Sequence, residues 1–270
     1  MSANPPADEL LDLATGIAAE AARLLARFAA TGFDVATKST RTDMVTDADR
    51  GSQSLIERLI LDARPGDGLL GEEGAARAGT SGVRWVFDPL DGTTNFIYGI
   101  PAYAVSIAVE VEGEVVAGVV HDVALREVFT AAKGRGARRN GAAIAISGNT
   151  DLGTALLATG FGYDPAARAE QAAMVARILP HIRDIRRGGS AALDLCHVAS
   201  GQLDGYFEYR LNPWDIAAGG LIVREAGGVT AGFGGHSFAD GYVIACAPGL
   251  LPGATALIDQ AYRAARDSAR

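Results

Sequence analysis

The sequence predicts a chain with an α+β first half and an α/β second half. In the first half, three apolar or alternating runs follow one another closely, which is typical of an antiparallel meander. In the second half, short apolar runs alternate with stretches of helical periodicity, as in α/β folds. The chain has 270 residues, 49% of them apolar, and shows no linker rich in Pro, Gly and Ser. We therefore expect residues 1–150 and 151–270 to pack as two halves of one compact unit.

The first half begins with an amphipathic helix over residues 7–29, where apolar residues recur at helical spacing and acids lie near the start. The polar segment KSTRTD (38–43) reads as a loop, and a second helix is predicted over 46–63. A short apolar strand then leads to Glu72. The meander follows, with turn signals at Glu112-Gly113 and Asn140-Gly141 and strands predicted over 104–112, 115–122 and 127–132.

The second half alternates strand and helix from residue 156 onward. Its apolar runs predict strands over 156–159, 182–185 and 206–208. Helical spacing predicts helices over 167–179, 191–200, 214–225 and 251–266.

Residues 85–96, WVFDPLDGTTNF, carry an apolar run directly into Asp88 and Asp91. We expect a buried strand that ends at Pro89, because proline donates no ladder hydrogen bond, with both carboxylates at its carboxyl end. Clustered carboxylate oxygens suit a hard cation, Mg²⁺ above all. Gly92 and the two threonines after it open a short helix, whose free backbone N–H groups suit an anion. The implied chemistry is metal-assisted hydrolysis of a phosphate ester.

The segment Asp-Pro-Leu-Asp-Gly could instead be only a tight turn, because Asp, Pro and Gly favour turns for local reasons. A pair of divalent cations needs more than two carboxylates, and the chain offers Glu72 in LLGEEG and Asp215 in NPWDIAAGG. Each of these has an ordinary alternative. Glu72 could belong to an exposed turn, and Asp215 could merely complement the dipole of a helix that Asn212 caps and Pro213 opens.

Together these blocks resemble the inositol monophosphatase family, within the wider group of Mg²⁺-dependent, lithium-sensitive phosphatases that includes fructose-1,6-bisphosphatase. The likeness is greatest to bacterial inositol-1-monophosphatases. It implies a fructose-1,6-bisphosphatase-like α/β/α/β/α sandwich, a site between the two halves, and a homodimer. The segments that carry it stand in family order: KSTRTDMVTDAD (38–49), GEEG, WVFDPLDGTTNF, RRGGSAALDLCHVASGQLDGYFE (186–208) and the Trp-Asp block.

The resemblance also implies roles for residues at the matching positions. Two or three Mg²⁺ ions would be held by four acids and one backbone carbonyl, those of Glu72, Asp88, Leu90 (carbonyl), Asp91 and Asp215. Asp88 would bridge two ions. The backbone amides of Gly92 and Thr93 would receive the phosphate. The Thr93 hydroxyl, hydrogen-bonded to Asp49, would orient the attacking water, and Glu72 would help to deprotonate it.

On the substrate side, Glu208 matches the family's acid that accepts inositol hydroxyls, and Asp215 would contact the substrate as well. Gly189, Ser190 and Ala191 resemble the loop at a helix start that lines the same pocket. Arg186 falls where bacterial members have a substrate-side arginine. The ordinary alternatives are a surface strand end for Glu208, a solvated charge for Arg186 and a simple turn for the glycines.

Lys38 is one of two lysines in the chain, and Asp43 belongs to the same segment. By resemblance they would lie near a peripheral third metal ion. The alternative is a solvated loop without a binding role.

Charge, apolar stretches and cysteine positions further restrict the class of protein. The net charge of −8 argues against a nucleic-acid partner. No apolar stretch reaches membrane-spanning length, and the first helix lacks the basic start of a signal peptide, so we expect a cytoplasmic protein without membrane contact. Cys196 and Cys246 lie in apolar runs, which indicates reduced cysteines in the core.

The leading interpretation is a phosphomonoesterase that hydrolyses myo-inositol monophosphate. Histidinol phosphate, fructose 1,6-bisphosphate and nucleotide 3'-phosphates stay open as substrates, because Arg187 or Arg210 could receive a second phosphate. A phosphatase with an aspartyl nucleophile would want Asp-x-Asp, whereas this chain has Asp-x-x-Asp. From another class, the chain could be a regulatory binding partner of the RNA machinery.

Overall fold

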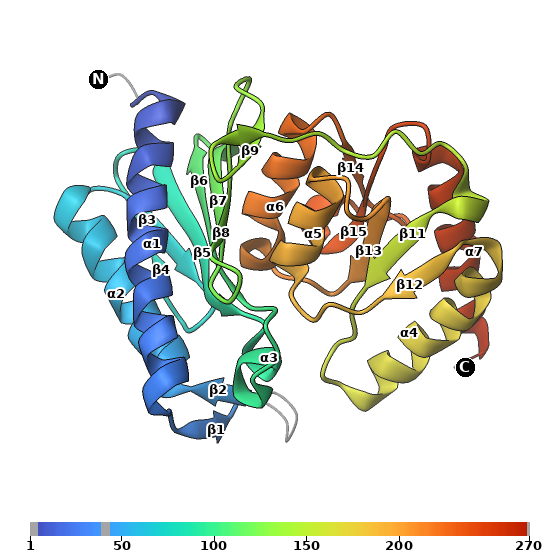
Figure 1. Cartoon of the computed structure of the whole chain (residues 1–270), viewed down its shortest axis with the longest axis horizontal. Helices are drawn as coiled ribbons and strands as arrows, with labels where there is room; N and C mark the ends of the chain where they lie inside the picture. Colours follow the sequence, from blue (N-terminus) through green and yellow to red (C-terminus); the bar gives the residue numbers. More distant parts are fainter. Residues whose placement is uncertain (1–4, 39–43, 269–270) are drawn as a thin grey trace.

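The computed structural model describes residues 5–38 and 44–268, which form five layers (Figure 1). Two helices cover the outer face of an eight-stranded sheet, two more lie between this sheet and a five-stranded one, and a last pair covers the far face. This order confirms the predicted α/β/α/β/α sandwich. The helix pairs, in layer order, are α1 (Ala7–Thr31) with α2 (Asp47–Ala63), α5 (Ala191–Ala199) with α6 (Pro213–Glu225), and α4 (Pro165–Ile178) with α7 (Leu251–Ser268).

The larger sheet contains the predicted meander at its centre. Strands β5 to β8 pair antiparallel in sequence order. Both turn signals are confirmed, because Glu112-Gly113 and Asn140-Gly141 adopt positive φ angles, as tight hairpin turns require. The strands, in sheet order, are β10 (Ala142–Ala143), β9 (Ala137–Arg139), β8 (Glu127–Ala132), β7 (Glu114–Asp122), β6 (Ala104–Val111), β5 (Val83–Asp91), β3 (Gly68–Gly71) and β4 (Ala76–Arg77).

The smaller sheet combines parallel and antiparallel pairing. Its β11 pairs parallel with both neighbours, whereas β15 pairs antiparallel with β13 and β14. The sequence analysis did not predict β14 and β15, although β15 contains the apolar run around Cys246. The strands, in sheet order, are β12 (Asp184–Arg186), β11 (Leu156–Thr159), β13 (Gly205–Tyr209), β15 (Tyr242–Cys246) and β14 (Val229–Ala231).

Short elements complete the chain. Strands β1 (Val35–Thr37) and β2 (Met44–Thr46), which were not predicted, pair antiparallel on either side of the predicted loop, of which residues 39–43 lie outside the described residues. Asp43, one of the predicted peripheral residues, lies outside the described residues. The predicted short helix after Gly92 is α3 (Thr93–Tyr98). Three 3-10 turns are η1 (Leu152–Thr154), η2 (Leu179–His181) and η3 (Phe238–Asp240).

The layer of α5 and α6 joins the two halves of the chain. Its apolar side chains form one buried cluster with residues from both sheets, such as Val86 and Val120 of the larger sheet and Val243 of the smaller one. Cys196 lies in this cluster, and both cysteines are buried and unpaired, as predicted. Because burial of apolar area is the main favourable term in folding, this shared cluster holds the two sheets in a fixed relation.

One local prediction is wrong, because strand β5 does not end at Pro89. Asp88 pairs with Ser106, and Asp91 pairs with Ala104, so three steps along β5 match two steps along β6. This extra residue is a β-bulge, and a proline is tolerated there because the ladder requires no N–H from it. The strand therefore continues to Asp91.

Within the described residues, no helix is both long and apolar enough to span a membrane.

Candidate active site

A cavity of about 270 Å³ opens between the two halves of the chain, and most of the predicted site residues line it. They come from the ends of β3, β5 and β13 and from the starts of α3, α5 and α6. Carboxylates that are far apart in the sequence therefore meet in one place. The predicted residues that line the cavity are Glu72, Asp88, Leu90, Asp91, Gly92, Thr93, Gly189, Ser190, Ala191, Glu208 and Asp215.

The bulge in β5 explains how Asp88 and Asp91 share this cavity. In a regular strand, residues three positions apart point to opposite faces of the sheet. The extra residue of the bulge corrects this offset, and both side chains line the cavity. Asp88 Oδ1 accepts a hydrogen bond from Leu90 N at 2.9 Å, which closes the bulge. The Leu90 N–H is thereby bonded to a side chain, and the Leu90 carbonyl accepts from Thr93 Oγ1 at 3.1 Å.

Gly92 links the strand to α3 in a conformation that favours glycine. Its φ is +90°, and a Cβ atom there would lie 2.8 Å from the Ala102 carbonyl oxygen. Both facts exclude an ordinary side chain. The backbone can therefore turn directly from Asp91 into the first turn of α3. The sequence predicted a helix start at Gly92 and the two threonines that follow it.

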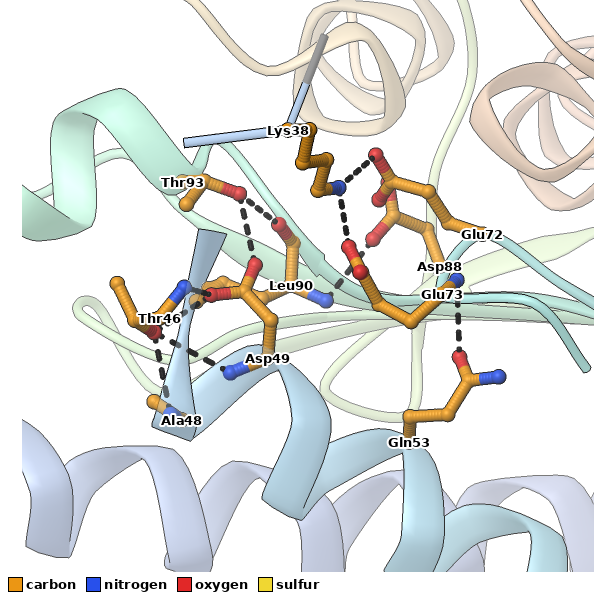
Figure 2. A network of polar contacts seen from close by, with 10 residues as sticks. All are labelled: Lys38, Thr46, Ala48, Asp49, Gln53, Glu72, Glu73, Asp88, Leu90 and Thr93. Atoms are coloured by element: carbon orange, nitrogen blue, oxygen red, sulfur yellow. Dashed lines mark hydrogen bonds and ion pairs between the residues drawn. The ribbon is translucent and has the colours of Figure 1, made fainter. Parts of the chain in front are cut away.

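Thr93 and Asp49 form the hydrogen bond that the resemblance implied, as Figure 2 shows. Thr93 Oγ1 lies 2.9 Å from Asp49 Oδ1 and 3.1 Å from the Leu90 carbonyl oxygen. The other carboxylate oxygen of Asp49 accepts from Thr46 N and Oγ1 at 2.7 and 2.5 Å. Thr46 is also the N-cap of α2, so a capping box fixes the orientation of the Asp49 carboxylate.

Lys38 lies over the GEEG turn (Figure 2). Its ammonium group donates to Glu72 Oε1 at 2.9 Å and also forms an ion pair with Glu73. The peripheral position predicted for Lys38 is thus next to one of the predicted metal ligands. In this structure a protein cation partly neutralises Glu72.

Asp91 and Asp215 each combine a helix-capping contact with a place in the cavity. Asp91 Oδ2 accepts from Ser190 Oγ at 2.5 Å and from Ala192 N at 2.8 Å, at the start of α5. Asp215 Oδ2 accepts from Asn212 N at 2.6 Å, in the capping box of α6. The structural role considered for Asp215 is therefore present, and the same side chain lines the cavity.

The gathered acids raise one another's pKa values. Burial raises the pKa of Asp88 well above its ordinary value, and the charges of the three other acids raise it further. Burial and then the charge of Asp91 raise the pKa of Asp215. Burial also raises the pKa of Glu72, although Lys38 opposes this effect. These shifts mean that the cluster resists holding several negative charges without a cation.

A second acidic group lies on the opposite wall. Burial raises the pKa of Glu208 to about 7, against the effects of a hydrogen bond from Tyr206 and of the charge of Arg187. Tyr206 Oη lies 2.5 Å from Glu208 Oε2. Asp194 is buried beside Glu208, and burial followed by the charge of Glu208 raises its pKa well above the ordinary value. This part of the cavity therefore offers oxygen acceptors, and two guanidinium groups, those of Arg187 and Arg210, line the same cavity.

Several residues of the cavity were not predicted or are replaced by a neighbour. Arg186 pairs with Asp184 at 2.7 Å, is exposed and does not line the cavity, whereas Arg187 does. Two consecutive arginines carry no periodicity that tells which one faces inward. Asp194 carried a usable signal, because it is a lone acid within the apolar run AALDLC. The aromatic residues Phe161 and Tyr163 also line the cavity.

The donor set fits a hard divalent cation. All the predicted ligands are oxygen atoms, and the pKa shifts indicate negative charge that lacks a partner. Within residues 5–38 and 44–268, no three Asp, Glu, His or Cys side chains already surround one point as metal ligands. Two of the predicted ligands instead face protein donors, because Glu72 accepts from Lys38 and Asp91 accepts from Ser190.

Comparison with known proteins agrees with the site. The profile of the inositol monophosphatase family matches residues 7–265. The chain belongs to the inositol monophosphatase family. It is 44% identical over 270 residues to inositol-1-monophosphatase SuhB of Mycobacterium tuberculosis, with 92% of each chain covered. It is 42% identical to the Nus factor SuhB of Escherichia coli, over 85% of this chain and 87% of that protein.

Comparison of the structure with solved structures points to the same family. A crystal structure of the extragenic suppressor protein SuhB from Bartonella henselae superimposes with a TM-score of 0.88 at 36% identity. The superposition covers 93% of this chain and 99% of the Bartonella henselae chain. Membership of the inositol monophosphatase family supports a phosphatase that uses the fructose-1,6-bisphosphatase-like sandwich, as expected from the motifs.

The repelling acids predict how stability depends on pH. A carboxyl group with a higher pKa in the folded than in the unfolded chain binds more protons when folded, so stability falls as the pH rises through the folded pKa. We expect the protein in EDTA to lose stability as the pH rises from about 4, near the ordinary pKa of a carboxyl group, through the raised pKa values of these acids. Above those pKa values, Asp88→Asn should unfold at a higher temperature than the wild type, because it removes a charge and keeps an acceptor for Leu90 N. Calorimetry measures both effects.

Asp62→Asn is the matched control, since Asp62 is exposed on α2. It should leave the unfolding temperature unchanged. A wild-type protein in EDTA whose stability rises over this pH range would contradict the repulsion.

Proposed function

We propose that the chain is a Mg²⁺-dependent phosphomonoesterase that hydrolyses myo-inositol monophosphate to inositol and phosphate by direct attack of water. The observation that supports this most is the meeting of four carboxylates in one cavity with Thr93, whose hydroxyl is hydrogen-bonded to the buried Asp49. The acids would hold the cations, and the hydroxyl would hold the nucleophile. No side chain is needed to form a covalent intermediate.

The chain's own groups would position the reactants. Divalent cations held by Glu72, Asp88, Asp91, Asp215 and the Leu90 carbonyl would lower the pKa of water and neutralise phosphate charge. Thr93 Oγ1 donates its hydrogen to Asp49 Oδ1, which leaves the lone pairs of the hydroxyl oxygen free to accept a hydrogen bond from water. Glu72 is the nearby base, and burial raises its pKa toward the range in which a base is effective. Backbone amides at Gly92 and Thr93 would hold the phosphate oxygens.

The opposite wall supports a polyol as the alcohol part of the substrate. Glu208 presents a carboxylate, and carboxylates accept hydrogen bonds from hydroxyl groups strongly. Its oxygen Oε2 is already oriented by Tyr206. Arg187 lines the same cavity, and its charge partly offsets the rise that burial causes in the pKa values of Asp194 and Glu208. The wall therefore suits inositol hydroxyls.

Removal of one predicted ligand tests the reaction. Asp215→Ala should lower kcat for inositol 1-phosphate by about 100-fold or more, because the charge that offsets a divalent cation is lost. EDTA should abolish turnover in the wild type, and Mg²⁺ should restore it. The assay should include fructose 1,6-bisphosphate, histidinol phosphate and a nucleotide 3'-phosphate. Full activity of Asp215→Ala, or of the wild type in EDTA, would contradict the proposal.

The pKa of Glu208 predicts a pH dependence of substrate binding. Because that pKa is about 7, the carboxylate is protonated as the pH falls through neutrality and loses acceptor capacity. KM for inositol 1-phosphate should therefore rise by roughly 10-fold from about pH 8 to about pH 6 in the wild type. In the variant Glu208→Gln, the side chain at this position is uncharged over the whole of this pH range.

The ratio of the two KM values separates Glu208 from the titration of the substrate phosphate. The variant's KM should exceed that of the wild type at the higher pH and approach it at the lower pH. A ratio that does not change with pH would show that Glu208 does not contact the substrate as a carboxylate.

A second role is favoured by one comparison, the 42% identity to a protein named Nus factor SuhB. We propose that this chain can also act as a regulatory partner of transcription, independently of hydrolysis. Asp88→Asn should abolish hydrolysis and leave binding to RNA polymerase or Nus proteins of the same organism unchanged, because Asp88 is buried. Failure of the wild type to bind any of these proteins in a pull-down with purified components would exclude this role.

A further inference from the structure

One buried face of α2 contacts each of the three segments that form the cation-binding wall of the cavity. Asp49, Ser52 and Gln53 are spaced i, i+3 and i+4, so they lie on one side of the helix. Their exposed fractions are 0%, 0% and 4%. Asp49 reaches Thr93, as described above. The two others reach the loops that carry the predicted ligands.

Ser52 supports the bulge of β5. Its Oγ donates to the Pro89 carbonyl oxygen at 2.9 Å. The irregular ladder between Asp88 and Asp91 leaves this carbonyl without a regular strand partner. A buried carbonyl without a donor costs about 1–3 kcal/mol, so Ser52 stabilises the bulge that places both acids on the cavity.

Gln53 supports the GEEG turn. Its Oε1 accepts from Glu73 N at 3.4 Å, and its Nε2 donates to Glu57 Oε1 at 2.8 Å, so the amide is held at both ends. The side chain lies against Gly71, where a Cβ atom would come within 2.9 Å of Nε2. The contact fixes the backbone directly after Glu72, as Figure 2 shows for Glu73.

We propose that Ser52 and Gln53 are positioning residues that set the distance between the GEEG turn and the β5 bulge, and thereby the affinity of the site for Mg²⁺. This inference rests on the proposed function, because it assigns Glu72 and Asp88 to the same cations. Neither side chain lines the cavity, so neither touches the substrate. Groups that orient metal ligands in this way commonly change metal affinity by about 10-fold to 100-fold when they are removed.

The test uses Ser52→Ala and Gln53→Met, which remove the hydrogen-bonding atoms with little change of volume. Titration calorimetry with Mg²⁺ should show roughly 10-fold weaker binding in each folded variant than in the wild type. Ser54→Ala is the matched control. Ser54 lies on the same helix, but its hydroxyl bonds only within that helix, to the Arg50 carbonyl oxygen, so the variant should bind Mg²⁺ as the wild type does.

Hydrogen exchange gives a second readout that needs neither metal nor activity. In EDTA, Gln53→Met should speed exchange at the Glu73 amide, and Ser52→Ala should speed exchange at the Leu90 amide. Each variant should affect its own loop. A residue with only a general stabilising role would instead raise exchange throughout α2 and leave the Mg²⁺ affinity of the folded protein unchanged.

The outcomes separate the inference from the proposed function. If the wild type binds Mg²⁺ and both variants bind it within twofold as tightly, the positioning role is overturned and the proposed function stands. If the wild type binds no Mg²⁺, the proposed function fails, and unchanged exchange at Glu73 and Leu90 would overturn the positioning role as well.

Discussion

Four carboxylates meet at one cavity and repel one another, and the packing around them must offset this repulsion. Asp88 is 2% exposed and is surrounded by the charges of three other acids. Such a cluster is unfavourable in an empty protein, so the fold must hold it in place with other interactions. The apolar cluster around α5 and α6 does this on a large scale, because it clamps the two sheets together. The β5 bulge, the helix caps and the α2 contacts do it locally.

Helix caps orient three of the acids at or next to the cavity. Asp49, Asp91 and Asp215 each accept hydrogen bonds at the start of a helix, where backbone N–H groups lack partners. A helix start also stabilises negative charge. Asp91 and Asp215 also line the cavity, so the same two carboxylates stabilise helix starts and contribute charge to the site.

Much of the fold could be predicted from the sequence, because long periodic segments such as 7–29 and the meander carry strong signals. Two kinds of feature could not. Strand β14 is only three residues long and has no clear alternation, and the bulge at Pro89 depends on pairing with β6. The order of the five layers came from the family resemblance rather than from periodicity. At the site, the motifs predicted the four acids that line the cavity. Ser52 and Gln53 were missed, and the substrate-side role was given to Arg186 although Arg187 lines the cavity, because such roles depend on which way a side chain points once distant segments have packed.

The most direct test of the central claim is anomalous diffraction from crystals grown with Mn²⁺, which replaces Mg²⁺ at oxygen sites. We predict anomalous peaks in contact with Asp88 and at least two of Glu72, Asp91 and Asp215. We also expect the Lys38 ammonium group to have moved away from Glu72 Oε1. Crystals with ample Mn²⁺ but no peak at these oxygens, and with Lys38 still bound to Glu72, would contradict it.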